Sequence, residues 1–113
     1  MVFLRGRFEN LVASQLLKFC HYTEDTQGHR MELRYLRDTD GREVDFVVVK
    51  DKRPMFAVEV KTGDVGISPS LRYFKERTGI PRWYQVHART KDVQVEGVRI
   101  LPLAALCKAE GLP

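Results

Sequence analysis

Three charged residues lie inside the two most apolar stretches of this chain. Asp45 is flanked by Val44 and Phe46, while Glu59 and Lys61 alternate with apolar residues in the segment 56–61. A carboxylate in a buried strand is costly unless a cation or a hydrogen-bond donor compensates its charge. Two carboxylates and a lysine on neighbouring strands therefore predict a functional site.

The chemistry of this predicted site follows from its ligand types. Two ionised carboxylates about 4–5 Å apart repel by roughly 3–4 kcal/mol at an effective dielectric constant near 20, so a cation is expected beside them. Lys61 can supply part of that charge, and Mg²⁺ or Mn²⁺ held by Asp45 and Glu59 can supply the rest. Bound metal would polarise a phosphate oxygen and acidify a water, and Lys61 could orient that water or stabilise developing negative charge. The sequence thus predicts phosphodiester hydrolysis.

The strands that position these residues can be paired by counting. The polar segment 50–54 is interpreted as a five-residue loop, which brings Asp45 opposite Glu59 and places Lys61 on the same face. The other face is then wholly apolar, and its residues are Val44, Phe46, Val48, Phe56, Val58 and Val60.

The preceding strand begins at Met31 and enters a hairpin that turns at residues 38–41. If Arg37 faces Arg42, Tyr35 lies opposite Val44 and Arg34 lies opposite Asp45. The three apolar residues of this strand, Met31, Leu33 and Tyr35, are then expected on the apolar face.

The remaining elements follow from spacing and capping signals. Apolar residues predict a first helix over 8–19, with a packing stripe formed by Phe8, Leu11, Val12, Leu16 and Phe19, and the polar stretch 23–30 is predicted to be a surface loop. Ser68 before a proline and a glycine at position 79 delimit a second helix. The chain is completed by a strand over 82–87 that is parallel to the strand of Glu59, a short edge strand over 98–101, and a terminal helix with Pro102 at or near its first position.

At this point the chain resembles a known superfamily. The spacing Asp45…Glu59-x-Lys61 is similar to the signature of the PD-(D/E)XK restriction-endonuclease-like proteins, and the predicted element order is similar to their α-β-β-β-α-β core. The resemblance implies an α/β fold with a mixed central sheet flanked by helices. It also implies that an acidic residue of the first helix joins the metal site, and Glu9 occupies that position.

A narrower resemblance covers nearly the whole chain from about Gly6. The segments 6–13, 36–38, 41–46 and 58–61 resemble the C-terminal domain of unknown function of prokaryotic AAA-type ATPases. This resemblance implies an AAA-type ATPase partner, either in the same chain or as a separate protein. Because no P-loop motif occurs here, ATP hydrolysis by this chain is not predicted, and residues 1–113 are interpreted as one domain, a fragment or the C-terminal part of a longer protein.

Composition supports a nucleic-acid partner. The 113 residues carry a net charge of +4, a mild basic excess that favours polyanions such as DNA. Arg34, Arg72 and Lys75 are the candidate phosphate contacts, with solvated surface positions as the alternative. No apolar run reaches the roughly 18 residues of a membrane span, and the two unpatterned cysteines are typical of reduced thiols, so a cytoplasmic protein is expected.

Two functions from different classes remain open at this point. The first is a metal-dependent nuclease in which Asp45, Glu59 and Glu9 hold Mg²⁺ or Mn²⁺ and Lys61 assists. The second is a catalytically inactive module that binds nucleic acid or docks onto an ATPase. In the second case the charged trio forms a structural ion network, because such networks also perturb ionisable groups.

Overall fold

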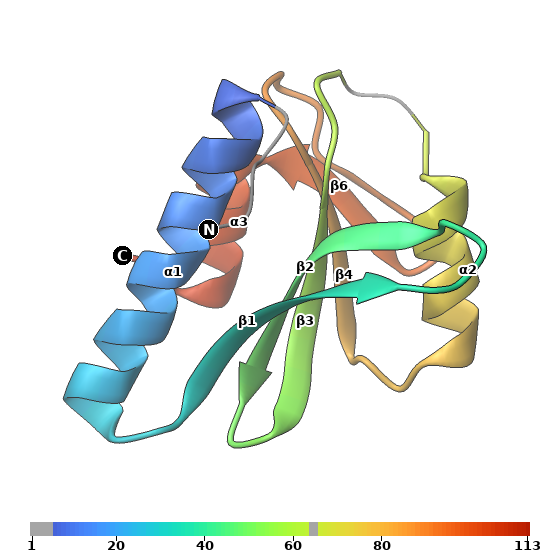
Figure 1. The fold of residues 1–113 in the computed structure, drawn as a ribbon. Helices are drawn as coiled ribbons and strands as arrows, with labels where there is room; N and C mark the ends of the chain where they lie inside the picture. The colour runs from blue at the N-terminus through green and yellow to red at the C-terminus, as the bar shows by residue number, and fades with distance from the viewer. Residues whose placement is uncertain (1–5, 64–65) are drawn as a thin grey trace.

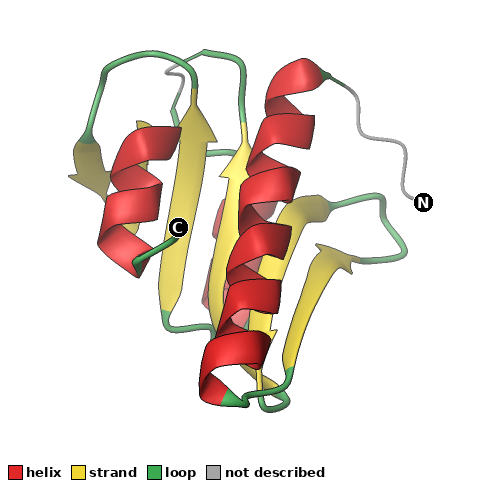
Figure 2. Ribbon diagram, turned by 90° about the vertical axis from the view of Figure 1, so that its left-hand side faces the viewer, coloured by secondary structure: helices red, strands yellow, loops and turns green. Residues whose placement is uncertain are grey.

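The computed structural model describes residues 6–63 and 66–113. Within these residues a six-stranded mixed sheet, in the order β1-β2-β3-β4-β6-β5, is covered by α1 and α3 on one face and by α2 on the other (Figures 1 and 2). The elements are, in chain order, α1 (Arg7–Gln27), β1 (Met31–Arg37), β2 (Glu43–Lys50), β3 (Arg53–Val60), α2 (Pro69–Arg77), β4 (Arg82–His87), β5 (Val93–Val95), β6 (Val98–Pro102) and α3 (Leu103–Glu110).

The topology confirms the predicted α/β class. Strands β1, β2 and β3 form an antiparallel meander, and β4 returns parallel to β3 after the α2 crossover. This is the α-β-β-β-α-β order expected from the sequence. The strand predicted over 98–101 is present as β6, parallel to β4, but it is not the edge strand that was predicted, because the unpredicted three-residue strand β5 pairs along its other side. No helix among the described residues has the length and apolar character needed to cross a membrane.

Helix α1 is longer than predicted. It continues to Gln27 and ends at Gly28, which adopts a left-handed φ of 72° and donates its N–H to the Glu24 carbonyl at 3.1 Å. The predicted loop is therefore wrong for residues 23–27, because Thr23 continues the buried side of the helix and is only 4% exposed. Leu11, predicted in the packing stripe, is half exposed.

The register between β1 and β2 differs from the prediction. Arg37 pairs with Glu43 rather than with Arg42, and Arg34 pairs with Val47. Arg34 therefore does not lie opposite Asp45. The predicted pairing relied on the length of the turn alone. The turn is one residue longer than predicted, and an irregularity further along β2 shifts the pairing again.

That irregularity is a β-bulge at Asp45 and Phe46. The pairing of Arg34 with Val47 and of Leu36 with Val44 leaves two β2 residues, Asp45 and Phe46, opposite the single residue Tyr35. The bulge interrupts the alternation of side chains, so Val44 packs on the α2 face instead of the α1 face that was predicted. Tyr35, predicted to be packed, is 56% exposed. Bulges redirect side chains, and here the residue affected is Asp45.

The connection between β2 and β3 is tighter than predicted. It is a two-residue turn, Asp51 and Lys52, with positive φ values of 50° and 69°, as in a type I′ hairpin. A register shift after Val48 compensates for the shorter loop, so that Phe46 pairs with Val58 as predicted. Asp45 and Glu59 lie directly beyond this last pair of residues, and their side chains lie close together.

Candidate metal centre

The site forms where β2 and β3 separate. Their backbone pairing ends at Phe46 and Val58. Beyond that pair, the Val60 N–H donates to the carboxylate Oδ2 of Asp45 at 2.8 Å, so a side chain takes the place of a strand carbonyl. Asp45 is half-buried in this fork, beside Glu59. The predicted proximity of the two carboxylates is confirmed.

Glu59 is held in an environment that disfavours its charge. Only 5% of the residue is exposed. Burial, together with a hydrogen bond that protonated Glu59 donates to Asp45 and the charge of Asp45, raises the pKa of Glu59 to about 8. A hydrogen bond from Ser68 and the charge of Lys61 act in the opposite direction. At neutral pH, Glu59 therefore keeps a proton that it shares with Asp45.

Two residues that sequence reasoning missed fix the position of Glu59. Ser68 caps α2 by accepting the Leu71 N–H at 3.4 Å, and its hydroxyl donates to Glu59 Oε2 at 3.0 Å. Gln85 is fully buried and lies beside Glu59 in the parallel β3–β4 ladder. Its Oε1 accepts the Ser68 N–H at 2.9 Å, and its Nε2 donates to the Gly66 carbonyl at 2.9 Å.

A signal for one of these residues was present in the sequence. Gln85 is a polar residue in the apolar segment 83–86, which is the same kind of anomaly that identified Glu59. The link through Ser68 could not be read from the sequence, because it depends on the path of the chain between β3 and α2.

Glu9 lies in the first turn of α1 and is partly exposed. The N-terminus of α1 and the C-terminal end of β3 lie at the same end of the molecule (Figures 1 and 2). However, no group of three or more His, Cys, Asp or Glu residues suited to a metal ion occurs among the described residues. The structure thus does not join Glu9 to Asp45 and Glu59 in such a group, and its metal role stays a prediction.

The Asp45–Glu59 pair has the donor chemistry for a hard divalent cation. Asp45 and Glu59 each accept one hydrogen bond from the protein through one carboxylate oxygen, and each has a second oxygen. A divalent cation would replace the shared proton and remove the repulsion between the two carboxylates. Mg²⁺ commonly binds through only one or two carboxylates and keeps several waters, so this donor set fits Mg²⁺ or Mn²⁺.

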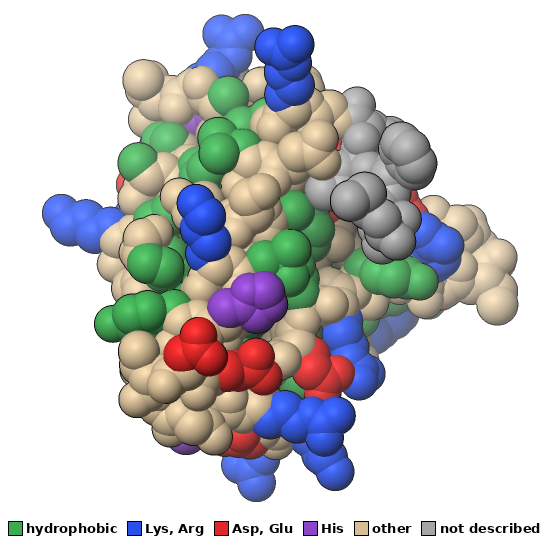
Figure 3. All heavy atoms as spheres, turned by 60° about the vertical axis from the view of Figure 1, so that its left-hand side comes forward, with side chains coloured by type: hydrophobic (Ala, Val, Ile, Leu, Met, Phe, Trp, Pro, Cys, Tyr) green, Lys and Arg blue, Asp and Glu red, His purple; other side chains and the backbone are tan. Residues whose placement is uncertain are grey.

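The predicted phosphate contacts have other neighbours within the protein. Arg34 on β1 forms an ion pair with Glu32, and Arg72 on α2 forms one with Glu96 at 3.0 Å. Lys75 on α2 lies against Gly97. Their nucleic-acid role stays a prediction. Figure 3 shows that Lys and Arg side chains on the α1 side of the molecule occupy several separate places, with acidic side chains between some of them.

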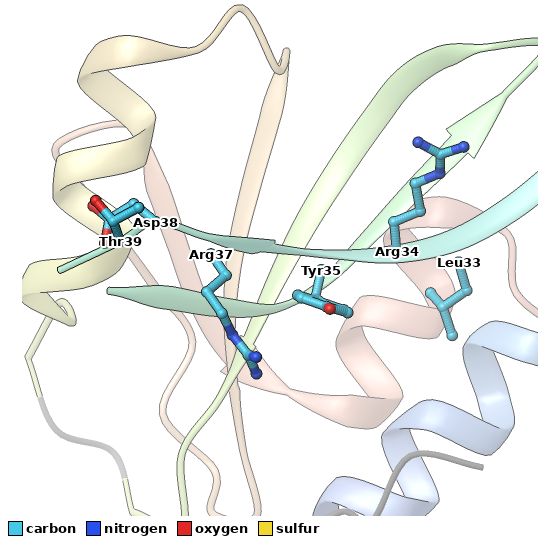
Figure 4. A pocket seen from close by; sticks show the side chains of 6 residues that line it. All are labelled: Leu33, Arg34, Tyr35, Arg37, Asp38 and Thr39. Carbon is cyan, nitrogen blue, oxygen red and sulfur yellow. The ribbon is translucent and has the colours of Figure 1, made fainter. Parts of the chain in front are cut away.

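A shallow hollow lies along the outer side of β1 rather than at the carboxylate pair. Leu33, Tyr35 and Arg37 point to one side of the strand and Arg34 to the other (Figure 4). The Arg37 guanidinium carbon lies 5.0 Å from the centre of the Tyr35 ring. The hollow is lined by Leu33, Arg34, Tyr35, Arg37, Asp38 and Thr39.

Comparison with known proteins gives one match. The family model described as Domain of unknown function (DUF4143) matches residues 6–106. No curated protein and no solved structure matches the chain.

Proposed function

We propose, from the premise that this chain belongs to the DUF4143 family of domains of unknown function, that it hydrolyses DNA phosphodiester bonds with Mg²⁺ or Mn²⁺. One observation carries the proposal: Glu59 is buried against Asp45, and Lys61 lies close enough for its charge to act on Glu59. The similarity of Asp45…Glu59-x-Lys61 to the PD-(D/E)XK signature supports the same chemistry. Domains of this family are commonly found with AAA ATPases, which supports an ATPase partner.

Each residue of the site has a distinct role in this proposal. Asp45 and Glu59, assisted by Glu9, would hold the divalent ion, which stabilises phosphate charge and acidifies a bound water. Binding of the ion would require Glu59 to release its shared proton to solvent. Lys61 orients the attacking water or stabilises the negative charge that develops on the phosphate oxygens. Ser68 keeps the Glu59 carboxylate in place through its hydroxyl.

A specific observation favours a second candidate function. The shared proton already neutralises part of the charge of the pair, and no third acidic, histidine or cysteine ligand joins it among the described residues. Such a site is also consistent with a catalytically inactive domain that binds nucleic acid or docks onto an AAA-type ATPase. In that case neither DNA nor partner binding requires a divalent ion.

Cleavage assays on supercoiled, linear duplex and single-stranded DNA separate the two functions. The proposed enzyme cleaves DNA with Mn²⁺ and not with EDTA, and Asp45→Asn is expected to lower the rate at least ~100-fold because one metal ligand is weakened. Asp40→Asn changes an aspartate on the exposed β1–β2 turn and is the matched control.

Absence of cleavage, or equal rates in wild type and Asp45→Asn, would overturn the enzymatic proposal. DNA binding that persists in Asp45→Asn without any metal requirement would then support the docking or binding module.

A further inference from the structure

The loop between β4 and β5 is closed by a buried histidine. His87 ends β4 and is fully buried. Its Nδ1 accepts the Arg89 N–H at 3.0 Å, and its Nε2 contacts the Lys91 carbonyl oxygen at 2.8 Å. Because Nδ1 accepts a hydrogen bond, Nε2 carries the proton and donates to Lys91. Both ring nitrogens are thus used to hold one short loop, and His87 has no nitrogen left for a metal ion.

This loop places Arg89 close to the C-terminal end of β3, which is the end of the strand that carries the carboxylate site. Strands β3 and β4 are parallel, and the Lys61 N–H donates to the Val86 carbonyl at 2.9 Å just beyond the end of β3. Arg89 Nε lies 3.9 Å from where a Cβ on Gly63 would be, two residues after Lys61. The Arg89 side chain therefore lies along the segment that leaves the site. Ligands of parallel sheets bind at this end of the strands.

Arg89 carries an exposed positive charge. The residue is exposed, and in residues 6–63 and 66–113 no carboxylate forms an ion pair with it. By contrast, Arg34 and Arg72 both face glutamates. An exposed arginine that lies against the segment after Lys61, and that has no acidic partner among the described residues, suits an anion that comes from outside the protein. A guanidinium fork matches the two oxygens of a phosphate.

We propose that Arg89, positioned by His87, contacts a backbone phosphate of DNA that flanks the Asp45–Glu59 pair. The ligand class rests on the proposed function, whereas the contact itself requires neither a metal ion nor cleavage. Arg89 is thus a substrate-binding residue, and His87 is a positioning residue that fixes the loop carrying it.

Fluorescence anisotropy with labelled DNA of about 20 nucleotides, single-stranded and duplex, tests this proposal in EDTA. Arg89→Ala is expected to weaken binding roughly tenfold at low salt and to reduce the slope of log K against log salt by about 1 for duplex DNA. Arg89→Lys, which keeps the charge and loses the fork, is expected to recover part of the affinity.

Arg53→Ala is the matched control, since Arg53 is an exposed arginine at the opposite end of β3 (Figure 1). It should change the affinity less than twofold, and thermal unfolding should show that each variant is folded. Equal losses in Arg89→Ala and Arg53→Ala, unchanged binding in Arg89→Ala, or no DNA binding by wild type would overturn the proposal. If wild type binds through Arg89 but never cleaves with Mn²⁺, the proposed hydrolysis fails and the contact stands.

Discussion

Replacing Lys61 with alanine is expected to lower the rate of Mn²⁺-dependent DNA cleavage by about 10²–10³-fold, the loss typical of removing one group that stabilises transition-state charge. Lys61 is half-buried just beyond β3, and its charge acts on the buried Glu59 carboxyl. Its backbone N–H bonds to the Val86 carbonyl, so the strand pairing does not depend on the side chain. The loss should therefore be in turnover rather than in folding.

Single-turnover cleavage with excess protein measures this effect, and calorimetry measures Mn²⁺ affinity in the same variants. Lys50→Ala is the matched control because Lys50 is a half-buried lysine at the end of β2, next to the β2–β3 turn. Lys61→Ala should retain Mn²⁺ binding within a few-fold. Cleavage that is equally reduced in Lys50→Ala, or unaffected in Lys61→Ala, contradicts a role for Lys61 in the reaction.

The stability of the metal-free protein is expected to fall as pH rises from about 4.5 to about 8. Glu59 has a pKa of about 8 in the folded protein, above its ordinary value of 4.5, because it is buried and lies beside Asp45. The folded state therefore binds more protons than the unfolded state within this window, and the free energy of unfolding decreases with rising pH. The maximum slope for one group is about 1.4 kcal/mol per pH unit, which gives a loss of a few kcal/mol across the window.

Urea unfolding in EDTA at several pH values between 5 and 8 measures this loss. Glu59→Gln keeps the size of the side chain and cannot ionise, so its stability should vary less with pH and exceed that of wild type at pH 8. Glu76→Gln, on the exposed side of α2, should follow the wild-type curve. Asp51, whose pKa is lowered by the Arg30 N–H and by His29, contributes stability that is lost only at more acidic pH. Parallel curves for wild type and Glu59→Gln would contradict the raised pKa of Glu59.

The closeness of Asp45 to Glu59 could be predicted because one face of both strands is almost entirely apolar. A one-residue slip would move every valine of that face toward the other side of the sheet, so the hydrophobic pattern specifies the register strongly. Phe46, Val48, Phe56, Val58 and Val60 indeed share the α1 face. The same pattern therefore placed the two carboxylates together although the turn at Asp51 and Lys52 was wrongly interpreted.

The parts that could not be predicted depend on local irregularities and distant contacts. The bulge at Asp45 has no residue signature, and together with the longer β1–β2 turn it displaces Arg34 from its predicted position. The hydrogen bond from Ser68 to Glu59 depends on how the chain returns to the sheet at the start of α2. A helix boundary at Gly28 was missed because the polar residues 24–27 are exposed helix positions rather than a loop.

Anomalous diffraction from crystals grown with Mn²⁺ tests the central claim most directly. The predicted result is a single strong peak between Asp45 and Glu59, with carboxylate oxygens roughly 2.0–2.2 Å away and waters completing an octahedron. The Val60 N–H and the Ser68 hydroxyl should still hold the opposite oxygens of the two carboxylates. Density without such a peak, with Asp45 and Glu59 still hydrogen-bonded to each other at high Mn²⁺ concentration, would contradict the metal site.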